Sequence, residues 1–84
     1  MSRYFFDIDD GEVTHDDRGV ELINLNVVRH YAVRVAQDCA SRHLGEGRSR
    51  SVAVSVRDPT GRRILRISLN CVIEGEASRD PPPR

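Results

Sequence analysis

The chain has 84 residues, of which 38% are hydrophobic and 31% are charged, and its formal net charge is zero. This length allows one small domain with a single hydrophobic core. The composition excludes a disordered acidic tail, and no apolar run reaches the roughly 18 residues that a membrane-spanning helix needs. The first residues, MSRYFF, lack the apolar stretch of a secretory signal, so we expect a cytoplasmic protein that does not contact a membrane.

The charged residues are unevenly distributed along the chain. Residues 1–26 carry two positive and seven negative side chains, whereas residues 44–73 carry six positive and two negative ones. All thirteen basic residues are arginines, a side chain suited to bidentate recognition of carboxylates and phosphates. A genome that favours arginine codons explains the same bias more simply.

The first predicted strand covers residues 3–8, which alternate in polarity with a period of two. Its predicted core face consists of Tyr4, Phe6 and Ile8, and its other face of Phe5 and Asp7. The strand ends at Asp10-Gly11, because glycine tolerates the positive φ of a tight hairpin turn. A short return strand through residues 13–15 follows, and a second turn at residues 16–19 leads through Val20-Glu21-Leu22 toward a helix.

The predicted helix covers residues 25–43, with Asn24 or Asn26 as its N-cap. Its apolar residues recur at spacings of three and four, and they are Leu25, Val28, Ala32, Val35, Ala36 and Cys39. The helix should end near Leu44-Gly45, because glycine adopts the left-handed conformation that often follows a helix. We expect the next segment, GEGRSR, to be an exposed loop.

Two further strands form a predicted hairpin around the turn Asp58-Pro59-Thr60-Gly61. The first strand starts at Ser51 and directs Val52, Val54 and Val56 to the core. The return strand, about residues 63–73, directs Leu65, Ile67, Leu69, Cys71 and Ile73 to the core. Its outer residues are Ile64, Arg66, Ser68, Asn70 and Val72. Residues 75–84 include three consecutive prolines and are expected to form a flexible tail.

These elements predict one α+β domain over residues 1–74. The order β-β-α-β-β favours two layers, in which an antiparallel sheet of three to four strands is covered on one face by the amphipathic helix. The outer face of the sheet should contact solvent or a partner. Cys39 and Cys71 lie on the predicted core faces, where free thiols behave as small hydrophobic groups. Whether these two thiols touch stays open.

Three segments of the chain resemble a family of small uncharacterised bacterial proteins. They are the opening RYFFDIDDG, the pattern D-x-x-G-V-E-L at Asp16 to Leu22, and the hairpin VAVSVRDPTGRRILRISL. The resemblance spans nearly all of residues 3–73 and implies a compact stand-alone domain without an established activity, cofactor or ligand. The chain is more loosely similar to the HicB-type antitoxin core, although it lacks the Pro-Asp-Leu-Pro-Gly-like segment of that core.

The acidic residues near the first turn raise the question of an active site. FFDIDDGEV resembles the first motif of haloacid-dehalogenase-type phosphatases, which would make Asp7 a nucleophile and Asp9 a proton donor. That fold needs a longer chain and a lysine, and this chain has no lysine. An EF-hand is excluded, because its register would put Phe6 and Ile8 at ligand positions. We therefore expect no catalytic residue and no cofactor.

No histidine or cysteine spacing in the chain predicts a metal site. The three histidines match no spacing typical of zinc ligands, and they are His15, His30 and His43. A looser cation site can be drawn from the acidic turn residues, which are Asp9, Asp10, Glu12, Asp16 and Asp17. We predict no metal ligand and leave the looser cation site open.

We expect the partner surface on the outer face of the sheet. Phe5 is predicted to be exposed there beside Asp7, and an exposed aromatic residue on a sheet suggests a surface that is covered in an assembly. The candidate partner-binding residues are Phe5, Asp7, Arg57, Arg66, Ser68 and Asn70. We predict a non-enzymatic domain that forms homo-oligomers, edge to edge or face to face, or that binds a small protein partner. The alternative is a nucleic-acid-binding or antitoxin-like regulatory adaptor that uses the arginine-rich face.

Overall fold

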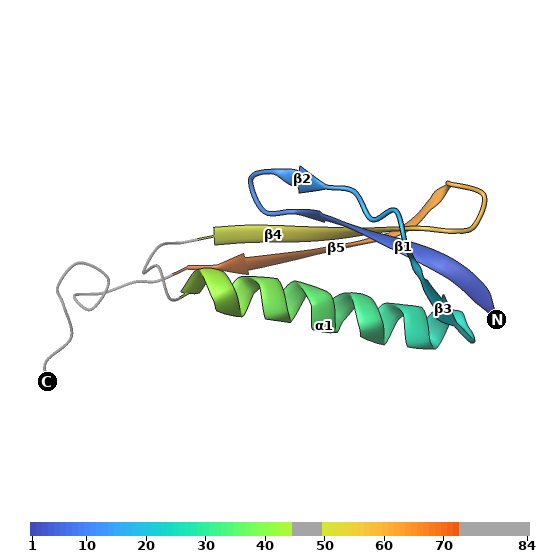
Figure 1. Cartoon of the computed structure of the whole chain (residues 1–84). Helices are drawn as coiled ribbons and strands as arrows, with labels where there is room; N and C mark the ends of the chain where they lie inside the picture. Colours follow the sequence, from blue (N-terminus) through green and yellow to red (C-terminus); the bar gives the residue numbers. More distant parts are fainter. Residues whose placement is uncertain (45–49, 73–84) are drawn as a thin grey trace, which may run out of the picture.

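The computed structural model describes residues 1–44 and 50–72. This part of the chain forms two layers, a five-stranded antiparallel sheet and one helix that covers one face of it (Figure 1). The elements are β1 (Ser2–Asp9), β2 (Val13–Thr14), β3 (Val20–Leu22), α1 (Leu25–Leu44), β4 (Arg50–Arg57) and β5 (Arg63–Cys71). The predicted α+β class is confirmed, with one strand more than expected. The sequence predicts a loop over residues 45–50; Arg50 begins β4 instead, and residues 45–49 lie outside the described residues. Ile73 and the predicted tail at residues 75–84 also lie outside them.

The additional strand is β3. The turn signals assign Val20-Glu21-Leu22 to the approach to the helix, and this assignment is wrong. These residues pair with the first half of β1, with Ser2 opposite Leu22, while β2 pairs with the end of β1, with Ile8 opposite Thr14. Three residues are too few to show a period of two, so the pairing has no local signal.

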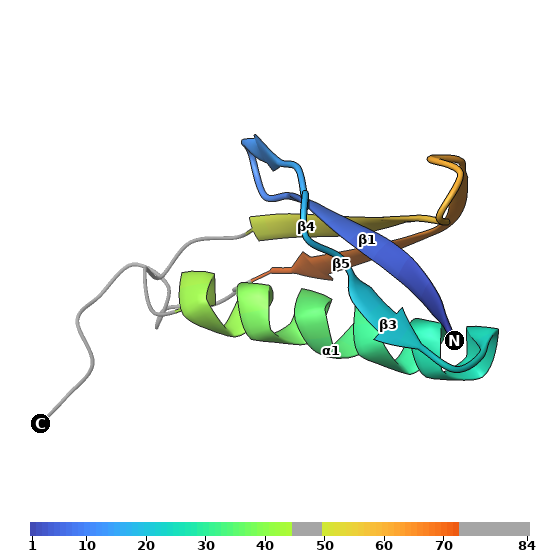
Figure 2. The same cartoon turned by 45° about the vertical axis from the view of Figure 1, so that its right-hand side comes forward.

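The sheet has the strand order β2-β1-β4-β5, with β3 beside the first half of β1. Asp7 of β1 lies opposite Ser55 of β4, and Ser55 lies opposite Arg66 of β5. These three residues therefore form one row across the face away from α1. Figure 2 shows that the hairpin of β1 and β2 rises on this same side, above the plane of the sheet.

The hydrophobic core lies between the sheet and α1. Its buried residues are Phe6, Val28, Ala32, Ala36, Cys39, Ala40, Val52, Val54 and Val56. Ala53 is also buried, but it lies opposite Asp9 and Ser68 on the outer face. The prediction for Leu25 is wrong, since this residue is 63% exposed. It lies in the first turn of α1, where a cavity of about 360 Å³ separates the helix from the start of β5. Cys39 and Cys71 belong to one hydrophobic cluster and are both free thiols.

A β-bulge at the start of β5 changes the direction of two side chains. Val56 lies opposite Leu65, whereas the next residue, Arg57, lies opposite Arg63, so Ile64 is the extra residue of β5. Arg63 therefore shares the outer face with Arg57, and Ile64 lines the cavity on the helix side. The prediction that Ile64 faces outward is wrong, because strict alternation does not continue through a bulge.

Asn24 is the N-cap of α1. Its side-chain oxygen accepts a hydrogen bond from the N–H of Val27 at 2.9 Å, and its carbonyl accepts one from the N–H of Val28 at 3.1 Å. Of the two predicted caps, the structure therefore selects Asn24, and Asn26 lies within the first turn of the helix.

We expect Asn24→Ala to lower the free energy of unfolding by about 1 kcal/mol, because the N–H of Val27 loses its acceptor. Urea denaturation followed by circular dichroism measures this change. Asn26→Ala is the matched control and should change stability by less than about 0.5 kcal/mol. Equal losses in the two variants would contradict the assignment of the cap.

Candidate functional site

Asp7 and Arg57 form a partly buried ion pair on the outer face of the sheet, in which the Arg57 side chain is 29% exposed. Asp7 is 9% exposed, and its carboxylate accepts hydrogen bonds from Nε of Arg57 at 2.7 Å and from a terminal guanidinium nitrogen at 3.0 Å. The same guanidinium donates to the carbonyl oxygen of Asp16 at 2.8 Å and lies 5.0 Å from the centre of the Phe5 ring. The bidentate contact and the cation–π contact hold Arg57 in a defined position.

Asp16 supplies an acceptor that a strand would otherwise supply. Between the short strands β2 and β3, the N–H of Phe6 donates to Oδ2 of Asp16 at 3.0 Å. Oδ1 of Asp16 accepts from the N–H groups of Arg18 and Gly19, both at 3.0 Å, and the N–H of Asp16 donates to Asp7 at 2.9 Å. The D-x-x-G pattern is thus a structural element that completes this edge of β1.

The charges of this network shift the pKa values of its members. The hydrogen bond from Arg57 lowers the pKa of Asp7 below its ordinary value of 3.8, although burial opposes the shift. Asp7 in turn raises the pKa of Arg57. Burial also raises the pKa of Asp16, but the N–H groups of Gly19, Phe6 and Arg18 outweigh it and lower the pKa overall. Neither carboxyl group has the raised pKa that a general acid needs at neutral pH.

These contacts change the interpretation of Phe5 and Asp7. Both lie on the outer face, as the alternation predicts, but the expected exposure is wrong: Asp7 is buried and Phe5 is half-buried. The segment after β2 returns over this part of the sheet, and Arg57 lies against both side chains. Their contacts within the domain explain them without a partner. A returning loop has no periodicity, so the alternation along the strands could not predict that Phe5 and Asp7 are covered. The opposite charges of Asp7 and Arg57 are the sequence signal from which their contact could have been found.

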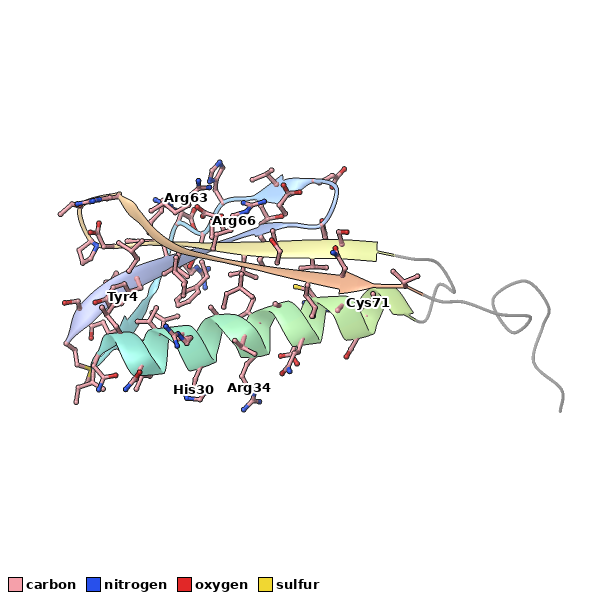
Figure 3. All side chains as sticks on the ribbon, turned by 180° about the vertical axis from the view of Figure 1, so that it is seen from behind. Tyr4, His30, Arg34, Arg63, Arg66 and Cys71 are labelled. Carbon is pink, nitrogen blue, oxygen red and sulfur yellow. The ribbon has the colours of Figure 1, made fainter. Side chains whose placement is uncertain are left out.

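The other candidate residues line two adjoining hollows on the outer face. The smaller, of about 220 Å³, is lined by Asp7, His15, Ser55, Arg57, Arg63 and Arg66, among others. The larger, of about 540 Å³, is lined by Asp9, Asp10, Ser51, Arg66, Ser68 and Asn70, among others. Arg66 borders both hollows. Figure 3 shows Arg63 and Arg66 on the side of the sheet opposite to His30 and Arg34 of α1.

Two hydrogen bonds order the floor of these hollows. Arg66 donates to the hydroxyl oxygen of Ser55 at 3.0 Å, and the hydroxyl of Ser51 donates to the side-chain oxygen of Asn70 at 2.6 Å. Of the predicted set, Arg66, Ser68 and Asn70 therefore lie together and exposed. The alternation did not find Arg63, because the bulge alone brings it to this face.

Within residues 1–44 and 50–72, no three histidine, cysteine, aspartate or glutamate side chains are grouped closely enough to hold a metal ion. Two of the acidic turn residues instead accept hydrogen bonds from backbone groups. Asp9 accepts one from the N–H of Gly11 at 3.2 Å, and Asp16 accepts one from the N–H of Phe6 in β1. In the part of the chain that the structure describes, no helix is long and apolar enough to cross a membrane.

The fold and its outer face define a small α+β domain in which an antiparallel sheet carries a hydrogen-bonded aspartate–arginine network. Residues 3–70 match the family described as "Domain of unknown function (DUF6894)", and the chain belongs to this family. The predicted membership of an uncharacterised domain family is thereby confirmed. No curated protein and no solved structure matches the chain significantly.

Proposed function

We propose that this chain is a non-enzymatic interaction domain of the cytoplasm, which forms a homodimer by pairing β5 with β5 of a second copy. The observation that carries the proposal is the contrast between the two edges of the sheet. On one side of the sheet, the backbone of β1 is covered: β2 and β3 pair with it, and Asp16 accepts a hydrogen bond from the N–H of Phe6. β5 ends the strand order on the other side and is nine residues long. The two free thiols support a reducing compartment.

The second half of β5 lacks the features that keep edge strands from pairing. Natural edge strands are commonly protected by charged residues, prolines or bulges. β5 has its bulge and both of its arginines in residues 63–66. Residues 67–71, with the sequence ISLNC, contain no charge, no proline and no bulge. This half of the strand is therefore open to pairing with another chain.

The helix-side residues of β5 are less well covered than those of its neighbour. On β4, Val52, Val54 and Val56 are at most 1% exposed. The corresponding side chains of β5 are only half-buried, and they are Leu65, Ile67, Leu69 and Cys71. A second β5 would extend the sheet and cover their remaining apolar surface, which favours association by about 25 cal/mol for each Å² buried.

Charge limits the register of such a pairing. In a two-fold antiparallel pair, the residues opposite each other lie at equal distances from the central residue. A centre at Arg66 would place two guanidinium groups opposite each other, which is unfavourable. A centre at Ile67 places Arg66 opposite Ser68. Centres at Ser68 or Leu69 also keep the two Arg66 side chains apart. These centres keep the pairing within the uncharged and bulge-free residues 67–71, so we place the axis between Ile67 and Leu69.

We expect Ser68→Lys to weaken the dimer about tenfold or more, since it adds one positive charge per copy close to the axis and to Arg66. Ser68 is exposed, so the fold should be retained. Size-exclusion chromatography with light scattering over a series of concentrations measures the effect. Ser51→Lys is the matched control, because it adds the same charge to the same face on β4, away from the edge.

Two results would overturn this proposal. The first is a wild-type protein that stays monomeric at millimolar concentration. The second is a Ser68→Lys variant that dimerises as strongly as the wild type. Loss of the dimer in Ser51→Lys as well as in Ser68→Lys would indicate face-to-face association instead of edge pairing.

A nucleic-acid-binding or antitoxin-like regulatory adaptor is the second candidate function. The arrangement of Arg63 and Arg66 on one exposed face supports it, because a basic sheet face is suited to a phosphate backbone. The position of Phe5 does not favour nucleic-acid binding. Single-stranded nucleic acid usually stacks on exposed aromatic rings, and Arg57 lies over the Phe5 ring.

A further inference from the structure

Arg63 and Arg66 differ from the paired arginines of the domain. Arg3 lies 3.5 Å from a carboxylate oxygen of Glu21, and Arg57 is bound to Asp7. Among the residues that the structure describes, neither Arg63 nor Arg66 has a carboxylate partner, and Arg66 donates only to the neutral hydroxyl of Ser55. Within the described part of the chain, two arginines without a carboxylate partner therefore border the same hollow of about 220 Å³, which is also lined by Asp9 and by the Asp7–Arg57 pair.

The bulge at Ile64 creates this arrangement. With regular alternation, Arg63 would share the helix side with Leu65, and only Arg66 would border the hollow. The extra residue turns Arg63 to the outer face opposite Arg57. Ser55 lies on the floor of the same hollow and accepts from Arg66, so its hydroxyl hydrogen remains available for another acceptor.

We propose that this hollow binds the phosphate group of a small hydroxylated ligand, such as a sugar phosphate. Arg63 and Arg66 supply the charge, because guanidinium groups match the oxygen geometry of a phosphate. Ser55 adds a neutral donor. The adjoining hollow, with the carboxylate of Asp9 and the side chains of Ser68 and Asn70, offers acceptors and donors to hydroxyl groups of the ligand body.

The surroundings favour a compact ligand over a polyanion. An extended chain of phosphates that follows the face beyond Arg66 meets the negative charges of Asp9 and Asp10 in the larger hollow. Asp9 also lines the smaller hollow, but it lies opposite Ala53, two positions along β4 from Ser55. A single phosphate between Arg63 and Arg66 therefore meets less of this repulsion than an extended chain does. Edge pairing of β5 leaves the outer face exposed, so this site and the proposed dimer can each fail without the other.

Titration of the ¹⁵N-labelled full chain in low-salt buffer tests the site, with amide and arginine Nε–H signals as the readout. Inorganic phosphate should shift the signals of Ser55, Arg63 and Arg66, and glucose 6-phosphate should bind more tightly than phosphate. Glucose alone should not bind. Arg63→Gln and Arg66→Gln should each weaken glucose 6-phosphate binding about tenfold.

Arg34→Gln is the matched control, because it removes the same charge from α1 on the opposite side of the molecule and should bind as the wild type does (Figure 3). The spectra also report whether each variant is folded. Absence of any phosphate-induced shift would overturn the proposal, as would equal weakening by Arg34→Gln and Arg63→Gln. Tighter, salt-sensitive binding of a single-stranded oligonucleotide would replace the compact ligand with a nucleic acid.

Discussion

An Arg57→Met variant is expected to lose about 2 kcal/mol of its free energy of unfolding, since the largely buried carboxylate of Asp7 loses its charged hydrogen-bond donor. Asp7 is the carboxylate left behind, and its side chain is 11% exposed. The carbonyl of Asp16 loses a donor at the same time. Urea denaturation at neutral pH, followed by circular dichroism, measures the loss.

Two further variants separate the ion pair from a general effect of losing arginine. Arg66→Met removes an exposed arginine from the same face, and its effect should stay within about 0.5 kcal/mol. The double variant Asp7→Leu with Arg57→Met removes both charges of the pair and should recover part of the loss. If Arg57→Met is as stable as Arg66→Met, the ion pair does not stabilise the fold.

The pH dependence of the same variant follows from the lowered pKa of Asp7. A carboxyl group whose pKa is lower in the folded protein stabilises it above the unfolded-state pKa. That contribution is lost as the pH falls below the ordinary value of 3.8 toward the folded-state pKa. Because Arg57 is the main cause of the shift, the stability gap between wild type and Arg57→Met should narrow below about pH 4. A constant gap from neutral pH to pH 3 would contradict this assignment.

Gly19→Ala should destabilise the domain by about 3 kcal/mol, through a left-handed backbone and a steric clash together. Gly19 has φ of +74°. A Cβ atom there would lie 2.7 Å from Cγ of Arg3 and 3.0 Å from both the Phe5 ring and the carbonyl oxygen of Tyr4. The carbonyl belongs to β1 where β3 pairs with it, so it has little freedom to move. Thermal and urea unfolding measure the loss.

Gly61→Ala is the matched control for the backbone contribution. Gly61 has φ of +92°, but no atom lies within 4 Å of its added Cβ. This variant should therefore lose only the cost of the left-handed conformation, about 1–2 kcal/mol. If the two variants lose the same free energy of unfolding, the close approach of Gly19 to β1 does not contribute to the destabilisation of Gly19→Ala.

The elements that the sequence predicts well are those with a local repeating signal. Val52, Val54 and Val56 alternate with polar residues and are buried as expected, and Val28 and Ala32 follow the helical period. Asn24 is a recognisable cap, because its side chain acts within one turn. The prediction for Leu25 is wrong because periodicity specifies a direction around the helix axis and not the extent of the sheet beneath it.

The candidate site is predicted less completely, because its geometry depends on contacts between distant segments. The alternation placed Arg66, Ser68 and Asn70 on one face, and the structure confirms this grouping. Arg63 joins them only through a bulge, which the sequence does not mark with a glycine or a proline. The burial of Asp7 requires β4 and the segment around Asp16 at once, and no local pattern contains both.

The two parts of the aspartate–arginine network also differ in the order in which folding can build them. Asp16 contacts Phe6 and Asp7 across ten and nine positions of the chain, so these hydrogen bonds close short loops. Arg57 reaches Asp7 across 50 positions, and long loops close later because their entropy cost is larger. We therefore expect Asp7 to remain hydrated until β4 docks. In that order of events the carboxylate is dehydrated only in the step that brings Arg57 to it, so the folding chain does not bury an unpaired charge.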